Sequence, residues 1–307
     1  MPYLFVHFRE KLTPDGEQVH FAVSENGYDW KSLNDGKPIV TCDKGERGCR
    51  DIEIVRLFDG SFVLVATDLC IVRHMDENHN VNWYNLSHCG SQFLSLWRSD
   101  DLLHFSPKEL IDFSGYGFGC LWAPEVIYDE CRGEYLLHWS SMREDHMAIY
   151  FSTTRDFCSY SAPKLLFKKN QDVIDSHIVK VGDSYHLFYK NCDAPAMCMH
   201  ATSSDLYGPY VDDPCFSAFM ETLDKPGCFE APTTMIMPDG RWCLLLDFFG
   251  CEKEKMGYIP FVSRAAGDTA FQRNDRAFTF PYGFKHGHAI EITNKEYDLL
   301  CAYYSTT

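Results

Sequence analysis

A sequence pattern that recurs five times is the strongest constraint on how this 307-residue chain can fold. The first element of the pattern is a strand-like run ending in Ser, followed by an acidic turn and an aromatic residue. Its copies lie at 19–30, 93–105, 147–160 and 198–210, with a weaker copy at 258–271. The second element is a pair of apolar runs joined by a turn, at 52–68, 123–140, 176–190, 231–249 and 288–305. Alternating repeats of this kind are typical of folds built from one repeated unit.

The spacing of the repeat indicates a β-propeller. The second element begins at five comparable positions, which are Asp51, Trp122, Asp175, Glu230 and His286. Three of the intervals are 53 to 56 residues long, whereas the first is 71 and carries an extra stretch at 70–90. Helical periodicity is nearly absent, and each pair of elements supplies about four strands, which is one blade. We therefore expect an all-β, five-bladed β-propeller rather than a β-sandwich.

The order of the elements also predicts how the propeller closes. The chain begins with strands of the first element and ends with the second, so the last blade combines strands from both termini. This arrangement closes the ring and removes a free sheet edge. No break in composition divides the chain, so we expect one domain over residues 1–307.

Charge and cysteine content exclude several classes of partner. The net charge of −16 disfavours nucleic acid, and no apolar run is long enough to span a membrane. Residues 1–16 are typical of a strand rather than a signal peptide. The 14 cysteines form no CxxC pair, and several lie in apolar runs, so we expect reduced core thiols and a cytoplasmic protein. Nothing in the sequence specifies an oligomeric state.

Three carboxylates share one register of the repeat. The second element follows the connection between blades, so its first strand should line the central channel, with its first residue at the mouth. Asp51, Asp175 and Glu230 occupy this position in three blades. Like charges brought together raise at least one pKa, and acid–base catalysis needs one carboxyl protonated and another ionised. We expect a catalytic site, the alternatives being strand-end caps or ligands of a structural cation.

Other residues of the same face are candidate substrate contacts. Trp122 can stack on a sugar ring or fill the core, and His286 shares the register of the acids. The stretch 70–90 should border the pocket with His74, His79, Trp83, Tyr84 and His88, and Arg143 lies in a turn on the same face.

The motifs, taken in order, resemble glycoside hydrolase family 43 over nearly the whole chain. The segments that carry the resemblance are Arg50-Asp51-Ile52, Trp122-Ala123-Pro124-Glu125, Ile174-Asp175, Glu230-Ala231-Pro232 and His286-Gly287. The resemblance implies a general base at Asp51, a general acid at Glu230 and an orienting carboxylate at Asp175, with Arg50 beside the substrate. It also implies inversion of the anomeric centre, for which the two carboxyl groups lie roughly 6.5–9.5 Å apart.

The resemblance further implies the substrate class. Family members act mainly on α-L-arabinofuranosides and β-xylosides, and some act on galactans. We expect an exo-acting α-L-arabinofuranosidase that works on imported plant-derived oligosaccharides, with a β-xylosidase or galactan-active enzyme as the alternative. No cofactor is required for this reaction, although some members carry calcium near the late histidine, which is His286 here.

Two departures from the family pattern bear on the substrate. Ile52 replaces the usual Pro, and Ala231 replaces the usual Gly. If the backbone at Ala231 needs a positive φ, the side chain costs on the order of 1 kcal/mol. Retaining sucrose- and fructan-cleaving propellers are a further alternative, but Val6-His7-Phe8-Arg9 stands where they have Asn-Asp-Pro. A non-catalytic propeller that binds glycans is the alternative of another class.

Overall fold

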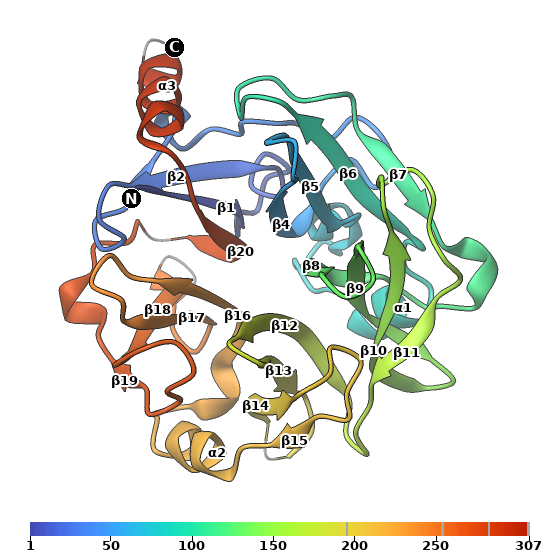
Figure 1. The fold of residues 1–307 in the computed structure, drawn as a ribbon. Helices are drawn as coiled ribbons and strands as arrows, with labels where there is room; N and C mark the ends of the chain where they lie inside the picture. The colour runs from blue at the N-terminus through green and yellow to red at the C-terminus, as the bar shows by residue number, and fades with distance from the viewer. Residues whose placement is uncertain (195, 253–254, 282, 306–307) are drawn as a thin grey trace.

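The computed structural model describes residues 1–194, 196–252, 255–281 and 283–305, and shows a chain made mainly of β-strands arranged around a common centre (Figure 1). The prediction of an all-β fold is confirmed. The strands form three sheets of four strands and one sheet of eight.

The three four-stranded sheets each follow the predicted repeat, with the strand that begins the second element at one edge. One sheet contains β8 (Trp122–Asp129), β9 (Glu134–Arg143), β10 (His146–Thr154) and β11 (Lys164–Phe167). The next contains β12 (Val173–Val181), β13 (Ser184–Asn191), β14 (Met197–Ser203) and β15 (Val211–Asp212). The third contains β16 (Phe229–Ile236), β17 (Trp242–Phe248), β18 (Gly257–Ser263) and β19 (Gln272–Arg273).

The eight-stranded sheet consists of two such groups. One group is β4 (Arg50–Arg56), β5 (Phe62–Thr67), β6 (Phe93–Ser99) and β7 (Glu109–Asp112). The other is β20 (Phe284–Glu291), β1 (Tyr3–Arg9), β2 (His20–Ser24) and β3 (Lys31–Ser32). A single parallel bridge between Gly287 and Ile52 joins the groups, whereas β20 pairs with β1 along most of its length. The last strand of the chain therefore lies in one sheet with the first.

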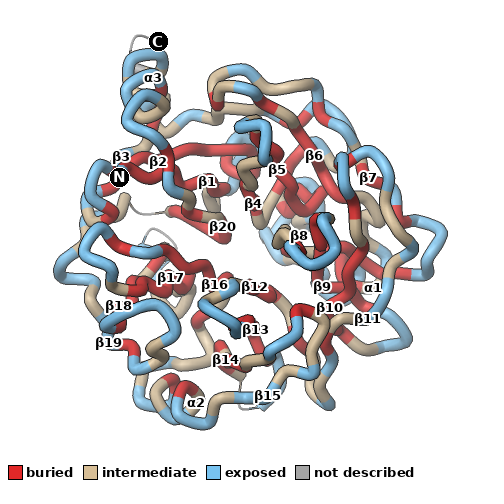
Figure 2. The backbone as a smooth tube through the Cα atoms, in the orientation of Figure 1, coloured by how far each residue is buried: buried red, intermediate tan, exposed pale blue. Residues whose placement is uncertain are grey.

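Apolar clusters between neighbouring groups of strands hold the inner strands in place. Strands β5, β9, β13 and β17 are buried almost throughout, and the loops at the periphery are exposed (Figure 2). The indole rings of Trp97, Trp139 and Trp242 are fully buried between sheets. Burial of this extent on both faces makes the ends of the inner strands fixed points, on which a precise site can be built.

The structure corrects the prediction for the last repeat, where residues 288–305 were expected to form two strands. Only the first part is a strand, and Asn294–Ser305 is the helix α3. Thr293 and Glu296 form a capping box, in which each backbone N–H donates to the other residue's side chain, over 2.7 and 3.2 Å. The place beside β20 is taken by β1 instead. The Thr-x-x-Glu signal was present in the sequence and was overlooked.

Two further helices lie outside the sheets. Helix α1 (Trp83–His88) lies in the predicted extra stretch between β5 and β6, and α2 (Pro214–Glu221) follows β15. None of the helices in the described part of the chain is long and apolar enough to cross a membrane.

Candidate active site

Four inner strands share a backbone irregularity at the point where the site is built. In β4, β8, β12 and β16 the strand register shifts within the first few residues. The residue at each shift has a positive φ: 54° at Asp51, 49° at Ala123, 54° at Asp175 and 53° at Ala231. A left-handed non-glycine residue costs on the order of 1 kcal/mol, and such strain gathers at functional sites. The positive φ expected at Ala231 is thus present.

A cavity of about 110 Å³ opens where these strands begin. Six of the predicted site residues line it, namely Arg50, Asp51, Trp122, Asp175, Glu230 and His286. Trp83 from the extra stretch also lines it, with its ring edge-on to Trp122 at a centroid distance of 6.3 Å.

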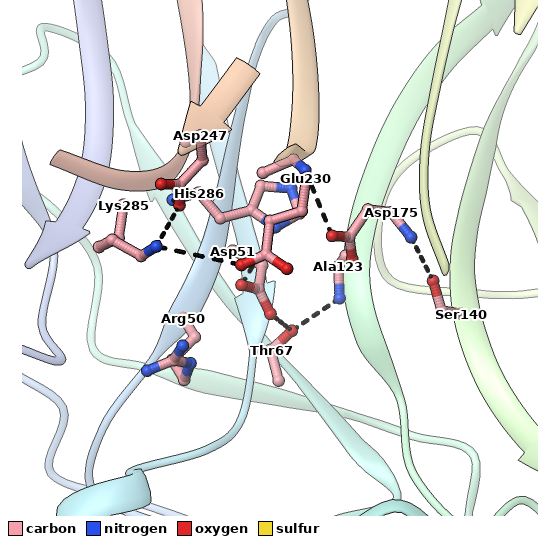
Figure 3. A network of polar contacts seen from close by, with 12 residues as sticks. Arg50, Asp51, Thr67, Ala123, Ser140, Asp175, Glu230, Asp247, Lys285 and His286 are labelled. Carbon is pink, nitrogen blue, oxygen red and sulfur yellow. Dashed lines mark hydrogen bonds and ion pairs between the residues drawn. The ribbon is translucent and has the colours of Figure 1, made fainter. Parts of the chain in front are cut away.

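Asp51 is held as an ionised carboxylate. Thr67 Oγ1 donates to Asp51 Oδ2 over 2.7 Å, and itself accepts from the Ala123 N–H (Figure 3). Asp51 Oδ1 lies 3.2 Å from Nδ1 of His286. Burial would raise the pKa of Asp51, but His286, Arg50 and Thr67 outweigh burial and lower it. Burial would likewise lower the pKa of His286, but Asp51 and Asp175 raise it to about 9. The imidazole is therefore an imidazolium at neutral pH.

Asp175 is in the opposite state. Burial raises the pKa of Asp175 to about 7, with the negative charges of Glu230 and Asp51 adding to the effect and His286 opposing it. Its backbone N–H donates to Ser140 Oγ over 3.0 Å, and its Oδ2 accepts from the Ala231 N–H over 3.3 Å (Figure 3). The carboxyl group is thus bonded to the residue directly after Glu230. One protonated and one ionised carboxyl can coexist here near pH 7.

Glu230 lies between two ammonium groups. Lys190 Nζ donates to Glu230 Oε2 over 3.5 Å, and Lys285 Nζ lies 4.0 Å from Oε1. Lys190 also lies over the ring of Phe249, 4.4 Å from its centroid. Glu230 is the most exposed of the three predicted acids, with 30% of its side chain accessible, compared with 15% for Asp51. Of the three acids, Glu230 is therefore the one that the leaving group of a bound substrate can approach.

Two predicted substrate contacts differ in their placement. Arg50 lines the cavity, with its guanidinium paired to Glu17 at 2.8 Å and lying over the ring of Phe8. Arg143 is exposed and is not among the lining residues; its guanidinium carbon lies 5.8 Å from the ring centroid of Phe118. The tight turn after it explains this position, because both central residues, Glu144 and Asp145, have a positive φ and so form a compact hairpin.

Three residues in the layer beneath the cavity have side chains of the types that bind metals. The donor atoms of Glu125, His177 and His288 lie within 4.8 Å of one another. Calcium takes six to eight oxygen ligands, and a set with two imidazoles does not fit it. His177 bonds Glu125 over 2.8 Å and Thr234 over 2.9 Å, so both of its ring nitrogens are already engaged. His286 is engaged with Asp51. The calcium expected near His286 therefore does not match the donors present, and no step is routed through it.

Sequence reasoning missed three charged residues of the site, which are Lys190, Asp247 and Lys285. Asp247 and Lys285 both line the cavity. The signal for Asp247 was an acid inside the otherwise apolar run 242–249, and Lys285 directly precedes His286. Neither position belongs to the register that drew attention to the other acids.

Sequence comparison places the chain among glycoside hydrolases. A sequence profile described as a probable glycosyl hydrolase domain, related to glycoside hydrolase family 43, matches residues 1–298. An α-L-arabinofuranosidase of Bifidobacterium longum is 24% identical over 274 residues, which cover 78% of this chain. The match covers only 24% of that protein, so the chain spans about a quarter of its length.

Structural comparison adds the fold. An endo-1,4-β-xylanase from Bacteroides thetaiotaomicron superposes with a TM-score of 0.59 at 14% identity, over 89% of this chain and 90% of that one. A family 43 protein from Bacillus licheniformis superposes with the same TM-score at 14% identity, over 96% of this chain and 57% of that one. Likeness at this level of identity establishes the fold alone.

The profile match over residues 1–298 and the arrangement of sheets around a common centre agree on one class of protein, the glycosyl hydrolase domains. The chain belongs to the family of probable glycosyl hydrolase domains related to glycoside hydrolase family 43. The resemblance drawn from the five motifs is confirmed.

Proposed function

We propose that the chain is an exo-acting, inverting glycosidase. The observation that carries the proposal is the meeting of Asp51, Asp175 and Glu230, from three different groups of strands, in one cavity of about 110 Å³. Removal of single sugars from a chain end is what the family resemblance implies. The opposite shifts of the Asp51 and Asp175 pKa values support acid–base chemistry rather than simple strand capping.

The residues divide the reaction between them. Asp51 accepts a proton from water, whose oxygen forms a bond to the anomeric carbon. The bond from that carbon to the leaving oxygen breaks, and Glu230 gives its proton to the leaving oxygen. Burial raises the pKa of Asp175 to about 7 and the charge of Glu230 adds to the effect, so the proton is best described as shared by the pair of Glu230 and Asp175. Both proton transfers are supplied by carboxyl groups, so the proposed reaction needs no cofactor.

We also propose that the groups of strands form a closed five-bladed propeller, and that residues 1–307 are one domain. Pairing of β20 with β1 supports closure, since it places strands from both ends of the chain in one blade. The single bridge between Gly287 and Ile52 is the contact of two neighbouring blades at the centre. A β-carbon on Gly287 would collide with the carbonyl oxygen of Val6 on β1, so only glycine fits where β20 pairs with β1 inside this blade.

For the substrate, we propose a terminal α-L-arabinofuranoside of a plant-derived oligosaccharide. The named activity of the Bifidobacterium longum relative supports it. A β-xyloside or a galactan is the alternative within the family. We propose a cytoplasmic location because all 14 cysteines are free thiols.

Release of nitrophenol tests the proposal. Nitrophenyl α-L-arabinofuranoside, β-D-xyloside and β-D-galactoside are each offered to the wild-type protein and to Glu230→Gln, whose melting temperature is checked first. We expect turnover of at least one compound by the wild type alone. If both proteins bind a plant oligosaccharide equally and neither cleaves any substrate, the chain is a glycan-binding propeller instead.

A further inference from the structure

One exposed aromatic side chain stands at the opening of the central cavity. Of the twelve described residues that line the cavity, only Trp83 is exposed, with 53% of its surface accessible. Asp51 and Glu230 expose 15% and 30% of their side chains by comparison. The indole ring of Trp83 therefore lies at the outer end of the cavity, where the cavity meets solvent.

The helix that carries Trp83 is packed onto the wall of the same cavity. Trp83 is the first residue of α1, and Leu86 on this helix is buried in an apolar cluster with Leu69 and Ile71. Trp122 packs against the cluster, and Leu69 and Trp122 both line the cavity. The position of the indole ring is thus fixed by the residues that form the cavity itself.

A buried glutamate fixes the start of the same stretch to the site. The carboxylate of Glu17 accepts from the backbone N–H groups of Ile71 and Val72, over 3.0 and 3.1 Å. It also accepts from the guanidinium of Arg50 over 2.8 Å, and Arg50 lines the cavity. A ligand that contacts Trp83 therefore does not have to order this stretch first, which lowers the cost of binding.

A matched aromatic elsewhere in the molecule shows which property of Trp83 is special. Phe58, in the turn between β4 and β5, is 78% exposed, and its ring lies edge-on to Tyr128 at a centroid distance of 4.5 Å. Trp83 lies edge-on to Trp122 in the same manner. Phe58 is not among the residues that line the cavity. Single exposed aromatic residues are ordinary, so the place of Trp83 at the cavity is what points to a ligand.

The proposed reaction indicates what that ligand is. The sugar whose bond breaks must lie among Asp51, Asp175 and Glu230, so the rest of the oligosaccharide extends toward solvent, past Trp83. The C–H groups of a sugar ring form an apolar face, for which an indole supplies a flat apolar surface, and the indole N–H can donate to a hydroxyl. The next sugar of the chain has the chemistry that fits this position.

We propose that Trp83 forms a binding subsite for the second sugar of the substrate, which carries the leaving oxygen, by stacking its indole ring on that sugar. This inference rests on the proposed function and extends it to the leaving group. It predicts that the protein prefers oligosaccharides to glycosides with a small leaving group, and that this preference depends on one side chain of the extra stretch 70–90.

Substrates that share the terminal sugar but differ in the leaving group test the proposal. For the sugar that the wild type releases, its disaccharide (arabinobiose, xylobiose or galactobiose) is compared with its methyl glycoside. Trp83→Ala should lower kcat/KM about tenfold on the disaccharide but less than about twofold on the methyl glycoside. Trp83→Phe, which keeps an aromatic ring, should restore most of the loss. Equal losses on both compounds, or no loss on either, would overturn the proposal.

Two controls separate contact with the sugar from folding. Phe58→Ala removes an exposed aromatic ring that is also edge-on to a neighbour, and should leave the ratio of the disaccharide and methyl glycoside rates unchanged. If the melting temperature shows that Trp83→Ala is unfolded, Trp83→Leu replaces it, because leucine keeps an apolar contact with Trp122.

Binding decides the inference if no glycoside is cleaved, an outcome in which the proposed function itself fails. Calorimetric titration then compares arabinobiose, xylobiose and galactobiose with the corresponding free monosaccharides. Binding of one disaccharide to Trp83→Ala that is at least about fivefold weaker, with binding of its monosaccharide unchanged, supports the subsite. Unchanged binding of every disaccharide, or an equal loss for both kinds of sugar, overturns it.

Discussion

The mouth of the channel and the layer directly beneath it are made of the same residue types and share three strands, β4, β12 and β20, yet they differ in state. The mouth holds Asp51, Asp175, Glu230 and His286. Two or three residues further along the inner strands lie Glu53, Glu125, His177 and His288. In the deeper layer the groups contact one another: His177 bonds Glu125, and His288 Nδ1 lies 2.7 Å from Glu53 Oε2, although that oxygen makes no hydrogen bond to any described residue. At the mouth the carboxylates also face a cavity.

This difference teaches that access, not polarity, distinguishes the site. Burial and the charge of Glu125 raise the pKa of Glu53 well above its ordinary value, whereas His177 overcomes burial and lowers the pKa of Glu125. Glu53 and Glu125 therefore have perturbed pKa values although neither lines the central cavity. A shifted pKa marks a candidate, and the cavity decides between catalysis and structure.

The largest expected effect is a loss of kcat when a carboxylate at the mouth is replaced. Asp51→Asn removes the base and keeps the shape of the side chain, so kcat should fall by about 10²–10⁴. The melting temperature should change by no more than about 2–4 °C, because Thr67 can still donate to the remaining oxygen. Steady-state kinetics on the cleaved nitrophenyl glycoside, with calorimetry, measures both. A variant with more than a tenth of wild-type kcat would contradict the role of Asp51.

The converse effect is expected in the deeper layer. Glu125→Ala leaves His177 without its carboxylate in a closed interior, and should lower the free energy of unfolding by about 3–5 kcal/mol. The fraction that stays folded should keep most of its activity. Urea unfolding and active-site-normalised rates measure the two quantities.

An exposed ion pair serves as the control for that variant. Glu130→Ala breaks the pair with Lys180, in which 67% of the glutamate side chain is exposed, and should cost about 0–1 kcal/mol. Equal losses in the free energy of unfolding for the two variants would show that the pair of Glu125 and His177 contributes no more than an exposed surface ion pair.

The pH dependence should report the coupled carboxyls at the mouth. Activity requires a proton on the pair of Asp175 and Glu230, so kcat/KM should fall as the pH rises through about 7. Asp175→Asn removes a negative charge beside Glu230, and the falling limb should move to lower pH. If the falling limb of the kcat/KM profile stays at the same pH, the limb reports a group other than Asp175 and Glu230.

The free energy of unfolding should also depend on pH through the titration of Asp175. The pKa of Asp175 in the folded protein lies above its ordinary value of 3.8, so the folded state binds the proton more tightly than the unfolded chain. Its contribution to stability is therefore lost between about pH 4 and pH 7, and Asp175→Asn should flatten that slope.

A smaller effect tests the strain at the mouth. Ala231 has a φ of 53°, a conformation that glycine adopts without penalty. Ala231→Gly should therefore raise the free energy of unfolding by about 0.5–1 kcal/mol, as measured by urea unfolding. Ala289→Gly, in the regular part of β20, is the control and should be destabilising.

The smallest effect is expected from chelation. The deeper donors are engaged with one another, so treatment with EDTA should leave the melting temperature unchanged within about 1 °C. A fall in melting temperature that zinc restores would show that Glu125, His177 and His288 hold a metal, and that the deeper layer is a metal centre instead of a closed network.

The repeat made the mouth predictable from sequence, because the first residues of the inner strands converge at the centre, and Asp51, Asp175, Glu230 and His286 were found in this way. The predicted common position is wrong by one residue. Asp51 and Asp175 are equivalent to Ala123 and Ala231, which share their positive φ, so Glu230 lies one residue earlier, level with Arg50 and Trp122.

Asp247 was not found in this way, because it lies on the second strand of its group and reaches the cavity only through the packing of neighbouring sheets. Arg143 does not line the cavity, because Glu144 and Asp145 form a tight hairpin after it, and its role as a substrate contact stays a prediction.

Helix α3 illustrates a different failure. The repeat predicted strands at 288–305, while the local Thr293–Glu296 capping box specified a helix, and the local signal prevailed. The strand was not needed there because β1, from the other end of the chain, fills its place next to β20.

The central claim is that Asp51 activates water while Glu230 protonates the leaving oxygen from the other side. Proton NMR of the first sugar released from the cleaved glycoside tests it most directly, before mutarotation mixes the anomers. The account predicts that the free sugar first appears with the anomeric configuration opposite to that of the substrate. Release with the configuration retained would mean that a carboxylate attacks the sugar itself, and would contradict the assignment of Asp51 as a general base.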